Sequence, residues 1–186
     1  MMNRLAHTRA YLCGAMDRVA DSGVIWRREL RAVHDDLKIT WLDPTDKPID
    51  MGVEDDNSRA RRRESKLHGR YDEVTAEIYP IRRVDLRMVD ISDWLAVNID
   101  LEVHATGTYE EVFLANRQKK PILARVEQGK HNAPDWLFAT IPHQLIFDDW
   151  EAMSDYIQHI AHDPVIETMG RWVFFDFHGE NLGEYE

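Results

Sequence analysis

The feature that most constrains the fold of this 186-residue chain is a repeated alternation of short apolar runs with segments of helical periodicity. Strands separated by helices form βαβ units, whose right-handed crossovers make neighbouring strands parallel. The pattern therefore predicts an α/β fold: one flavodoxin-like or Rossmann-like domain, with a mostly parallel five-stranded sheet flanked by helices. The apolar runs of strand length cover residues 9–14, 38–44, 94–99, 121–126 and 144–147.

Helices are expected between these strands, and the longest helical stretch covers residues 59–90. Proline lacks the N–H that a helix interior needs, so Pro80 is expected to divide this stretch into two helices. Asp21 or Ser22 is the expected N-cap of the first helix. Residues 45–58 are expected to form a polar loop near the ligand side. The other helices are predicted over residues 24–33, 107–119 and 149–162.

The length suits one domain with a full hydrophobic core and is too short for two ordinary domains. We therefore expect a single domain over residues 1–186, with its core at 8–163 and a C-terminal tail at 164–186. Within the tail, Arg171-Trp-Val-Phe-Phe-Asp-Phe is expected to form either an edge strand or a docking segment.

Charge and cysteine content exclude several classes of function. The net charge is −11, which disfavours a nucleic-acid polymer as partner, because little positive charge is available to replace phosphate counterions. Cys13, the sole cysteine and expected to be a small buried residue, permits neither an internal disulfide nor a cysteine-based zinc site. Neither a signal peptide nor an apolar run of ~18 residues is present, so we expect a cytoplasmic protein with no membrane contact.

The carboxyl ends of parallel strands form the edge of the sheet where ligands bind. Glu111 is expected in the first turn of the helix after the third strand, facing that edge. Gly107 stands at the turn before it, where a glycine lets a substrate approach the backbone closely. Asp85 and Asp93 come just before and at the start of the third strand. The edge is predicted to comprise residues 11–16, 42–46, 99–108 and 126–132.

Four stretches in this order resemble the nucleoside 2-deoxyribosyltransferases and their nucleotide N-glycosidase relatives. They span residues 9–126, about two thirds of the chain. The spacing of 26 residues between Asp85 and Glu111 also suits that family. The four stretches are Tyr11-Leu-Cys-Gly-Ala-Met, Asp85-Leu-x6-Asp93, Gly107-Thr-x-x-Glu111-x-x-x-Ala115 and Lys120-Pro-Ile-Leu.

The resemblance implies cleavage of the N-glycosidic bond of a 2′-deoxynucleoside or its 5′-monophosphate. Glu111 would attack C1′ of the sugar and form a covalent deoxyribosyl ester, while Asp85 would protonate the departing base and Tyr11 would orient Glu111. Two carboxyls with opposite duties need pKa values that are set apart. The sugar would then pass to another nucleobase or to water. Neither a metal nor an organic cofactor is implied.

The resemblance also implies partners and further site residues. The partners would be a small nucleoside or nucleotide, a nucleobase and further copies of the chain, in a homo-oligomer with shared active sites. Asn132 would contact the 5′ end of the sugar from a neighbouring subunit. Asp93 has a structural alternative, which is to pin the turn before its strand. The expected substrate-binding residues are Gly14, Met16, Asp43, Asp93, Gly107, Thr108 and Asn132.

This sequence departs from the family pattern at Ala105, where some members place the aspartate that binds the sugar 3′-hydroxyl. Asp100, Glu102 or His104 is the expected substitute. The departure keeps two other functions open. One is a nucleotide-sensing module without catalysis, and the other is an N-glycosidase that acts on a different ribosyl compound.

Residues 59–70 hold six basic side chains against one acidic side chain in an otherwise acidic protein. A solvated helix face or a subunit contact is the usual reason for such a run. The alternative is a phosphate clamp, because arginine binds phosphate in a bidentate manner. A clamp would favour a nucleotide over a nucleoside as substrate.

Overall fold

The computed structural model describes residues 3–52, 54, 56–163 and 167–175, and this part of the chain contains a five-stranded parallel sheet. The strand order β2-β1-β3-β4-β5 is that of flavodoxin-like folds, and it confirms the predicted α/β class. Every pairing is parallel, so the sheet is fully rather than mostly parallel. The strands are β1 (Arg9–Gly14), β2 (Thr40–Leu42), β3 (Trp94–Ile99), β4 (Ile122–Val126) and β5 (Ile146–Phe147).

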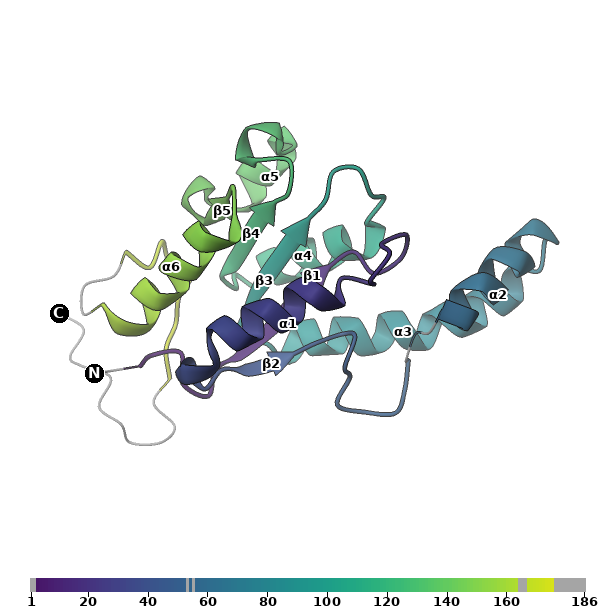
Figure 1. The fold of residues 1–186 in the computed structure, drawn as a ribbon, viewed down its shortest axis with the longest axis horizontal. Helices are drawn as coiled ribbons and strands as arrows, with labels where there is room; N and C mark the ends of the chain where they lie inside the picture. The colour runs from purple at the N-terminus through teal and green to yellow at the C-terminus, as the bar shows by residue number, and fades with distance from the viewer. Residues whose placement is uncertain (1–2, 53, 55, 164–166, 176–186) are drawn as a thin grey trace.

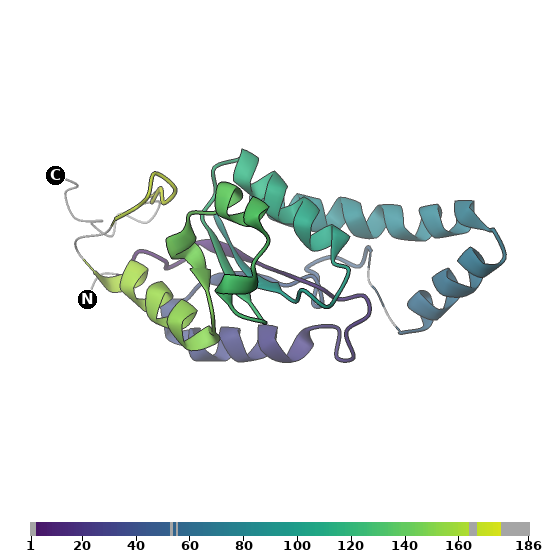
Figure 2. The same ribbon diagram turned by 90° about the horizontal axis from the view of Figure 1, so that it is seen from above.

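Helices cover both faces of the sheet (Figures 1 and 2). Helices α1 and α6 lie on one face, and α3 and α4 lie on the other. Helix α2 packs against α3, and the two form a hairpin that projects beyond the sheet (Figure 1). The helices are α1 (Val24–Val33), α2 (Asp56–Leu67), α3 (Tyr71–Ile91), α4 (Thr106–Arg117), α5 (Asp135–Thr140) and α6 (Trp150–His162).

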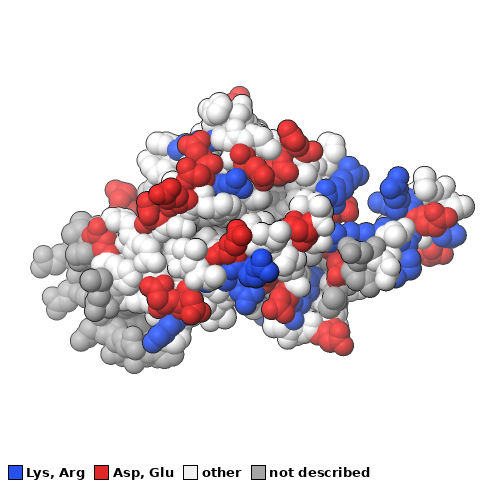
Figure 3. Space-filling model, in the orientation of Figure 1, with Lys and Arg blue, Asp and Glu red and all other residues white. Residues whose placement is uncertain are grey.

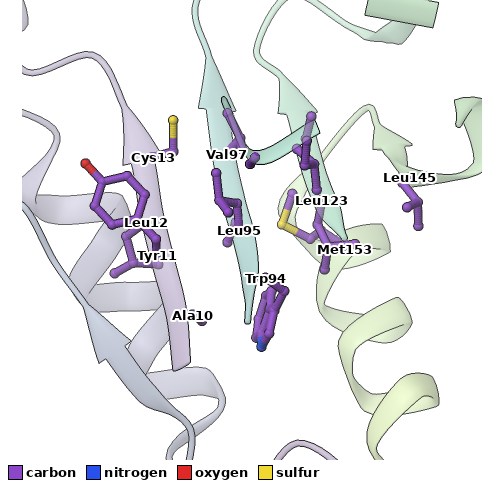
Figure 4. Close-up of a cluster of buried hydrophobic side chains, with 14 of the residues drawn as sticks. Ala10, Tyr11, Leu12, Cys13, Trp94, Leu95, Val97, Leu123, Leu145 and Met153 are labelled. Atoms are coloured by element: carbon purple, nitrogen blue, oxygen red, sulfur yellow. The ribbon is translucent and has the colours of Figure 1, made fainter. Parts of the chain in front are cut away.

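The core lies on both faces of the three central strands, and Figure 4 shows part of it. Strands β1, β3 and β4 are apolar almost without interruption because helices bury both of their faces. Leu5 and Trp172 are also buried, although they lie outside the expected core of residues 8–163. Both ends of the described chain therefore pack against the domain.

The stretch 59–90 does form two helices, but the prediction that Pro80 separates them is wrong. The break lies at residues 68–70, where Gly69 adopts a left-handed backbone conformation with φ of +69° that ends α2. Helix α3 continues through Pro80. A single proline removes one backbone hydrogen bond, and this long helix is held by its contacts with α2, α4 and β1.

The chain after β2 differs from the predicted loop of residues 45–58, because α2 already begins at Asp56. Residues 55–58 are Asp-Asp-Asn-Ser, and residues of these types are typical of a helix start. The short helix α5 was also not predicted. It covers only six residues, too few for helical periodicity to appear.

Helix α1 is capped differently from the prediction that Asp21 or Ser22 is its N-cap residue. Gly23 occupies the cap position, with φ of +70°. The carboxylate of Asp21 accepts hydrogen bonds from the N–H groups of Gly23 and Ile25, each at 3.0 Å. Asp21 therefore caps the first turn of α1 although it lies two residues before the N-cap position.

The tail forms a docking segment rather than an edge strand over its described residues, 167–175. The indole N–H of Trp172 donates to the hydroxyl of Tyr156 at 3.0 Å, and its ring packs against Trp94 with centroids 5.8 Å apart. Residues 176 and 177 of the predicted segment lie outside the described part of the chain.

A buried arginine on α1 organises the end of β1. Arg27 is fully buried, and its guanidinium lies 3.8 Å from the carboxylate of Asp43. The guanidinium also donates hydrogen bonds to four backbone carbonyls at the end of β1 and just before α1. They belong to Leu12 (3.1 Å), Gly14 (2.9 Å), Ser22 (3.1 Å) and Gly23 (3.0 Å).

The substitution Arg27→Met is therefore expected to lower the free energy of unfolding by about 3–5 kcal/mol, because it leaves a buried carboxylate and several carbonyls poorly satisfied. Urea denaturation at neutral pH measures this loss. Arg28→Met is the matched control on the exposed side of α1, with an expected change within about 0.5 kcal/mol. Equal stability of the two variants would contradict the role assigned to Arg27.

Candidate active site

A pocket of about 460 Å³ opens at the carboxyl ends of β1 and β3, where the strand order reverses. This is the place where parallel sheets of this kind bind ligands. The loop after β1, the segment between β3 and α4, and one side of α3 line the pocket. The projecting α2 adds a further wall. Tyr11, Asp85 and Glu111 all lie on the surface of this one cavity.

The carboxylate of Glu111 is held by a hydrogen bond on each oxygen. The hydroxyl of Tyr11 donates to Oε1 at 2.8 Å, and the thiol of Cys13 donates to Oε2 at 3.0 Å. Alternate residues of a strand point to the same face, so Tyr11 and Cys13 both face α4, where Glu111 lies in the second turn. Glu111 is 8% exposed, and that exposure is toward the pocket.

Burial raises the pKa of Glu111 from its ordinary value of 4.5 to about 7, although the hydrogen bonds from Cys13 and Tyr11 oppose this rise. Burial also raises the pKa of the Tyr11 hydroxyl and that of the Cys13 thiol. Both donors therefore keep their protons when the carboxyl ionises. The result is a carboxylate that forms near neutral pH while two fixed donors hold its orientation.

Asp85 lies on α3 across the same pocket and is largely buried. The ammonium of Lys47 is 2.7 Å from Oδ1 of Asp85, and Lys47 also donates to the carbonyl of Gly52 at 2.6 Å. Burial raises the pKa of Asp85, and Lys47 opposes the rise. A carboxyl in this setting can hold a proton more readily than an exposed aspartate, as a proton donor needs.

Four of the seven predicted substrate-binding residues line this pocket: Gly14, Met16, Gly107 and Thr108. A side chain at Gly14 would meet the ring of Trp26 at 2.9 Å, so packing requires glycine there. Apart from its chain neighbours and the backbone of its own helix, no atom lies within 4 Å of the place where a side chain on Gly107 would begin. Gly107 therefore leaves open space at the start of α4, as expected for close approach of a ligand.

The other three predicted binding residues lie elsewhere. Asp43 is buried against Arg27 and Arg31, where it completes an ion-pair cluster behind the pocket. Asp93 lies at the amino end of β3, at the opposite edge of the sheet, and accepts a hydrogen bond from the backbone N–H of Arg9 at 2.7 Å. For Asp93, the structure thus matches the alternative of pinning a turn. Asn132 borders an adjacent cavity rather than this pocket.

Among the three candidates to replace the missing aspartate at Ala105, only His104 lines the pocket. The side chain of Asp100 accepts hydrogen bonds from the N–H of Glu102 at 2.9 Å and from Gln128 at 2.7 Å, which orders the loop after β3. Glu102 is exposed. His104 is thus the one of these three side chains that a ligand in the pocket could contact.

Part of the basic run 59–70 reaches the pocket. Arg62 is buried there in an ion pair with Glu54, while the exposed Lys66 lines the pocket wall. Arg18 faces the same space from the loop after β1. Figure 3 shows Lys and Arg side chains on both sides of the cleft between the body of the molecule and the projecting helices.

Sequence reasoning missed the roles of Lys47 and Arg27 and interpreted Cys13 only as a small buried residue. Lys47 carried no signal, because it belongs to a stretch expected to be a polar loop. Arg27 follows Trp26 on a helix that was expected to be amphipathic, and its burial depends on carbonyls 4–15 residues away. For Cys13 a signal did exist, since period two in a strand places it on the same face as Tyr11.

Among residues 3–52, 54, 56–163 and 167–175, no group of three or more His, Cys, Asp or Glu side chains is close enough to hold a metal ion. Nor does any helix in those ranges have the length and apolar character needed to cross a membrane.

Comparison with solved structures finds a similar fold in a 2-deoxyribosyltransferase from the psychrotolerant bacterium Bacillus psychrosaccharolyticus. The TM-score is 0.53 at 14% sequence identity, and the match covers 80% of this chain and 92% of that chain. A conserved protein from Enterococcus faecalis V583 matches with a TM-score of 0.44 at 16% identity, over 82% and 87% of the two chains. No protein-family model and no curated protein matches the sequence. At this level of identity, the first match shows a shared fold.

The raised pKa of Glu111 makes stability depend on pH in a defined direction. The protonated carboxyl favours the folded state below pH 4.5, and this contribution is lost as the pH rises through about 7. Glu111→Gln removes the titration. The free energy of unfolding of the unaltered protein, relative to that variant, should therefore fall by about 3 kcal/mol between pH 4.5 and pH 8. Parallel pH dependence of the two proteins would show that Glu111 titrates normally.

Proposed function

We propose that this protein cleaves the N-glycosidic bond of a 2′-deoxynucleoside or its 5′-monophosphate, and that it belongs with the nucleoside 2-deoxyribosyltransferases. The observation that carries the proposal is the oriented carboxylate of Glu111, which shares one pocket with Asp85. The site lies at the ligand-binding edge of a fold shared with a 2-deoxyribosyltransferase. The residues that form it are those of the sequence motifs.

In the proposed reaction, ionised Glu111 attacks C1′ of the sugar while the bond from C1′ to the base nitrogen breaks. The electron pair of that bond leaves with the base, and an ester between Glu111 and the sugar remains. The hydroxyl of Tyr11 holds the nucleophile during attack, because it keeps its proton and donates to Oε1 at 2.8 Å. A preoriented nucleophile loses little entropy at the transition state.

Asp85 supplies the proton that the departing base needs. Its pKa is raised by burial, so it can carry a proton that an exposed aspartate would lose. After the base has left, Asp85 accepts a proton from the incoming base or from water, which then attacks C1′ and releases Glu111. Lys47, at 2.7 Å, stabilises Asp85 once it is ionised. The same residues serve both transfer and hydrolysis.

The pocket wall favours a substrate with a phosphate group. Lys66 and Arg18 line a cavity whose two other arginines, Arg62 and Arg82, are already paired with Glu54 and Glu110. The chain has a net charge of −11, so two cations at the pocket would attract an anionic group to a protein that otherwise repels it. We therefore propose the 5′-monophosphate as the preferred form of the substrate.

We further propose that copies of the chain associate around this site. The projecting hairpin exposes Leu67 and Tyr71 at its tip and Tyr79 along α3, which are 73%, 65% and 61% exposed. Large apolar side chains on a protruding element are typical of subunit contacts. Asn132 borders a cavity that shares residues 104–106 with the main pocket, which supports a contribution from Asn132 to a site between subunits.

Glu111→Ala is expected to lower kcat by a factor on the order of 10⁴ or more, because the covalent route is lost. The assay is chromatography of reactions with a panel of deoxynucleosides and deoxynucleoside monophosphates, with and without free base. Glu151→Ala, an exposed carboxylate on α6, is the control and should keep full activity. Full activity of Glu111→Ala would contradict the proposed nucleophile. Ligand binding without base release by the unaltered protein would instead indicate the sensing module.

Lys66→Ala is expected to raise KM for a deoxynucleoside monophosphate about tenfold and to leave KM for the matching deoxynucleoside unchanged, because a single charge-assisted contact to phosphate is removed. Arg63→Ala removes one positive charge from the exposed side of the same helix and is the matched control. Equal effects of Lys66→Ala on both substrates would argue against a phosphate contact.

A further inference from the structure

Cys13 lies beneath the pocket rather than on its wall. Its side chain is fully buried and does not line the cavity, so it cannot touch a bound substrate. Its thiol is nevertheless 3.0 Å from Oε2 of Glu111 and 3.7 Å from the carbonyl oxygen of Thr108. Both acceptors belong to the first two turns of α4. The thiol therefore joins β1 to the part of α4 that carries the nucleophile.

The two donors on Glu111 divide its oxygens between them. Tyr11 donates to Oε1 and Cys13 donates to Oε2, so rotation of the carboxylate would break one contact or both. Figure 4 shows the side chains of Tyr11 and Cys13, which are two residues apart on β1. A hydroxyl alone would fix one oxygen and leave the plane of the carboxylate free to turn.

We infer that Cys13 is a positioning residue for Glu111, acting through the hydrogen bond from its thiol to Oε2. The catalytic consequence of this inference rests on the proposed function. The hydrogen bond itself is a contact within the protein and does not depend on which substrate binds. The reaction still proceeds through Glu111, and Cys13 forms no covalent bond.

The titratable groups around Glu111, including the thiol of Cys13, set the pKa of its carboxyl. Tyr11 and Cys13 face it from β1, Asp85 from α3 and Arg27 from α1. Burial raises the pKa of Glu111, and the hydrogen bond from Cys13 is the foremost effect that lowers it. Loss of the thiol should therefore make the carboxylate harder to form at neutral pH. Cys13 keeps its own proton, because burial raises the pKa of the thiol.

Two substitutions separate hydrogen bonding from packing. Cys13→Ala removes the donor together with the sulfur, whereas Cys13→Ser removes the sulfur and retains a donor on the same carbon. Packing at the site suffers in both variants, and the buried hydroxyl of serine also needs an acceptor, for which Oε2 of Glu111 is nearer to position 13 than the carbonyl oxygen of Thr108. A purely structural role would therefore affect Cys13→Ser at least as strongly as Cys13→Ala.

The experiment that tests the inference follows the side-chain carboxyl carbon of Glu111 by ¹³C NMR as the pH is varied, with the signal assigned by its loss in Glu111→Gln. Cys13→Ala should shift the titration to higher pH, and Cys13→Ser should titrate close to the unaltered protein. Unchanged titration in Cys13→Ala, or equal shifts in both variants, would overturn the inference. This readout needs no substrate, so it remains decisive even if the proposed function fails.

The kinetic counterpart uses the same variants. Cys13→Ala should lower kcat about three- to tenfold at pH 7, which is the range expected for one hydrogen bond from a thiol, a weak donor, and should move the acidic limb of the kcat profile to higher pH. KM should stay the same, since Cys13 does not reach the substrate. Cys13→Ser should restore most of kcat. A change confined to KM or to thermal stability would count against a positioning role.

Discussion

The burial of one carboxylate governs the organisation of this protein. Glu111 is enclosed at the base of a pocket, where an ionised group loses solvation and must find donors in the protein. Tyr11 and Cys13 provide them, one for each oxygen. That arrangement requires β1 to lie directly beneath α4, with a register that points alternate side chains at the helix. The remaining carboxylate surface is left facing the cavity.

The surroundings of the pocket come from segments that are far apart in the sequence. Arg27 and Asp43 hold the end of β1 and the start of α1 from behind, so the loop between them keeps its shape without contact to a ligand. Lys47 approaches Asp85 from the chain after β2. The two carboxyls of the site thus sit in different environments. Glu111 has neutral donors, whereas Asp85 has a cation beside it that opposes the rise of its pKa caused by burial.

The sheet and its helices could be predicted because burial on both faces leaves continuous apolar strands, and because helical spacing is visible in long segments. Glu111, Tyr11 and Asp85 could be placed at one edge by topology together with motif order. Pro80 misled the prediction, since tertiary contacts stabilise α3 across a proline and Gly69 ends α2. Asp93 was named as a binding residue from its motif alone, although its predicted place at the start of the third strand already put it at the edge of the sheet opposite the pocket. Lys47 and Arg27 act on partners that no local pattern reveals.

The central claim is that Glu111 forms a bond to the sugar, and mass spectrometry of acid-quenched protein tests it most directly. After brief incubation with a deoxynucleoside monophosphate, the protein should gain the mass of the phosphodeoxyribosyl group, and peptide mapping should place that mass on Glu111. The added mass should disappear when free base is supplied in excess or when time is allowed for hydrolysis. Base release without any adduct, or an adduct on another residue, would contradict the account.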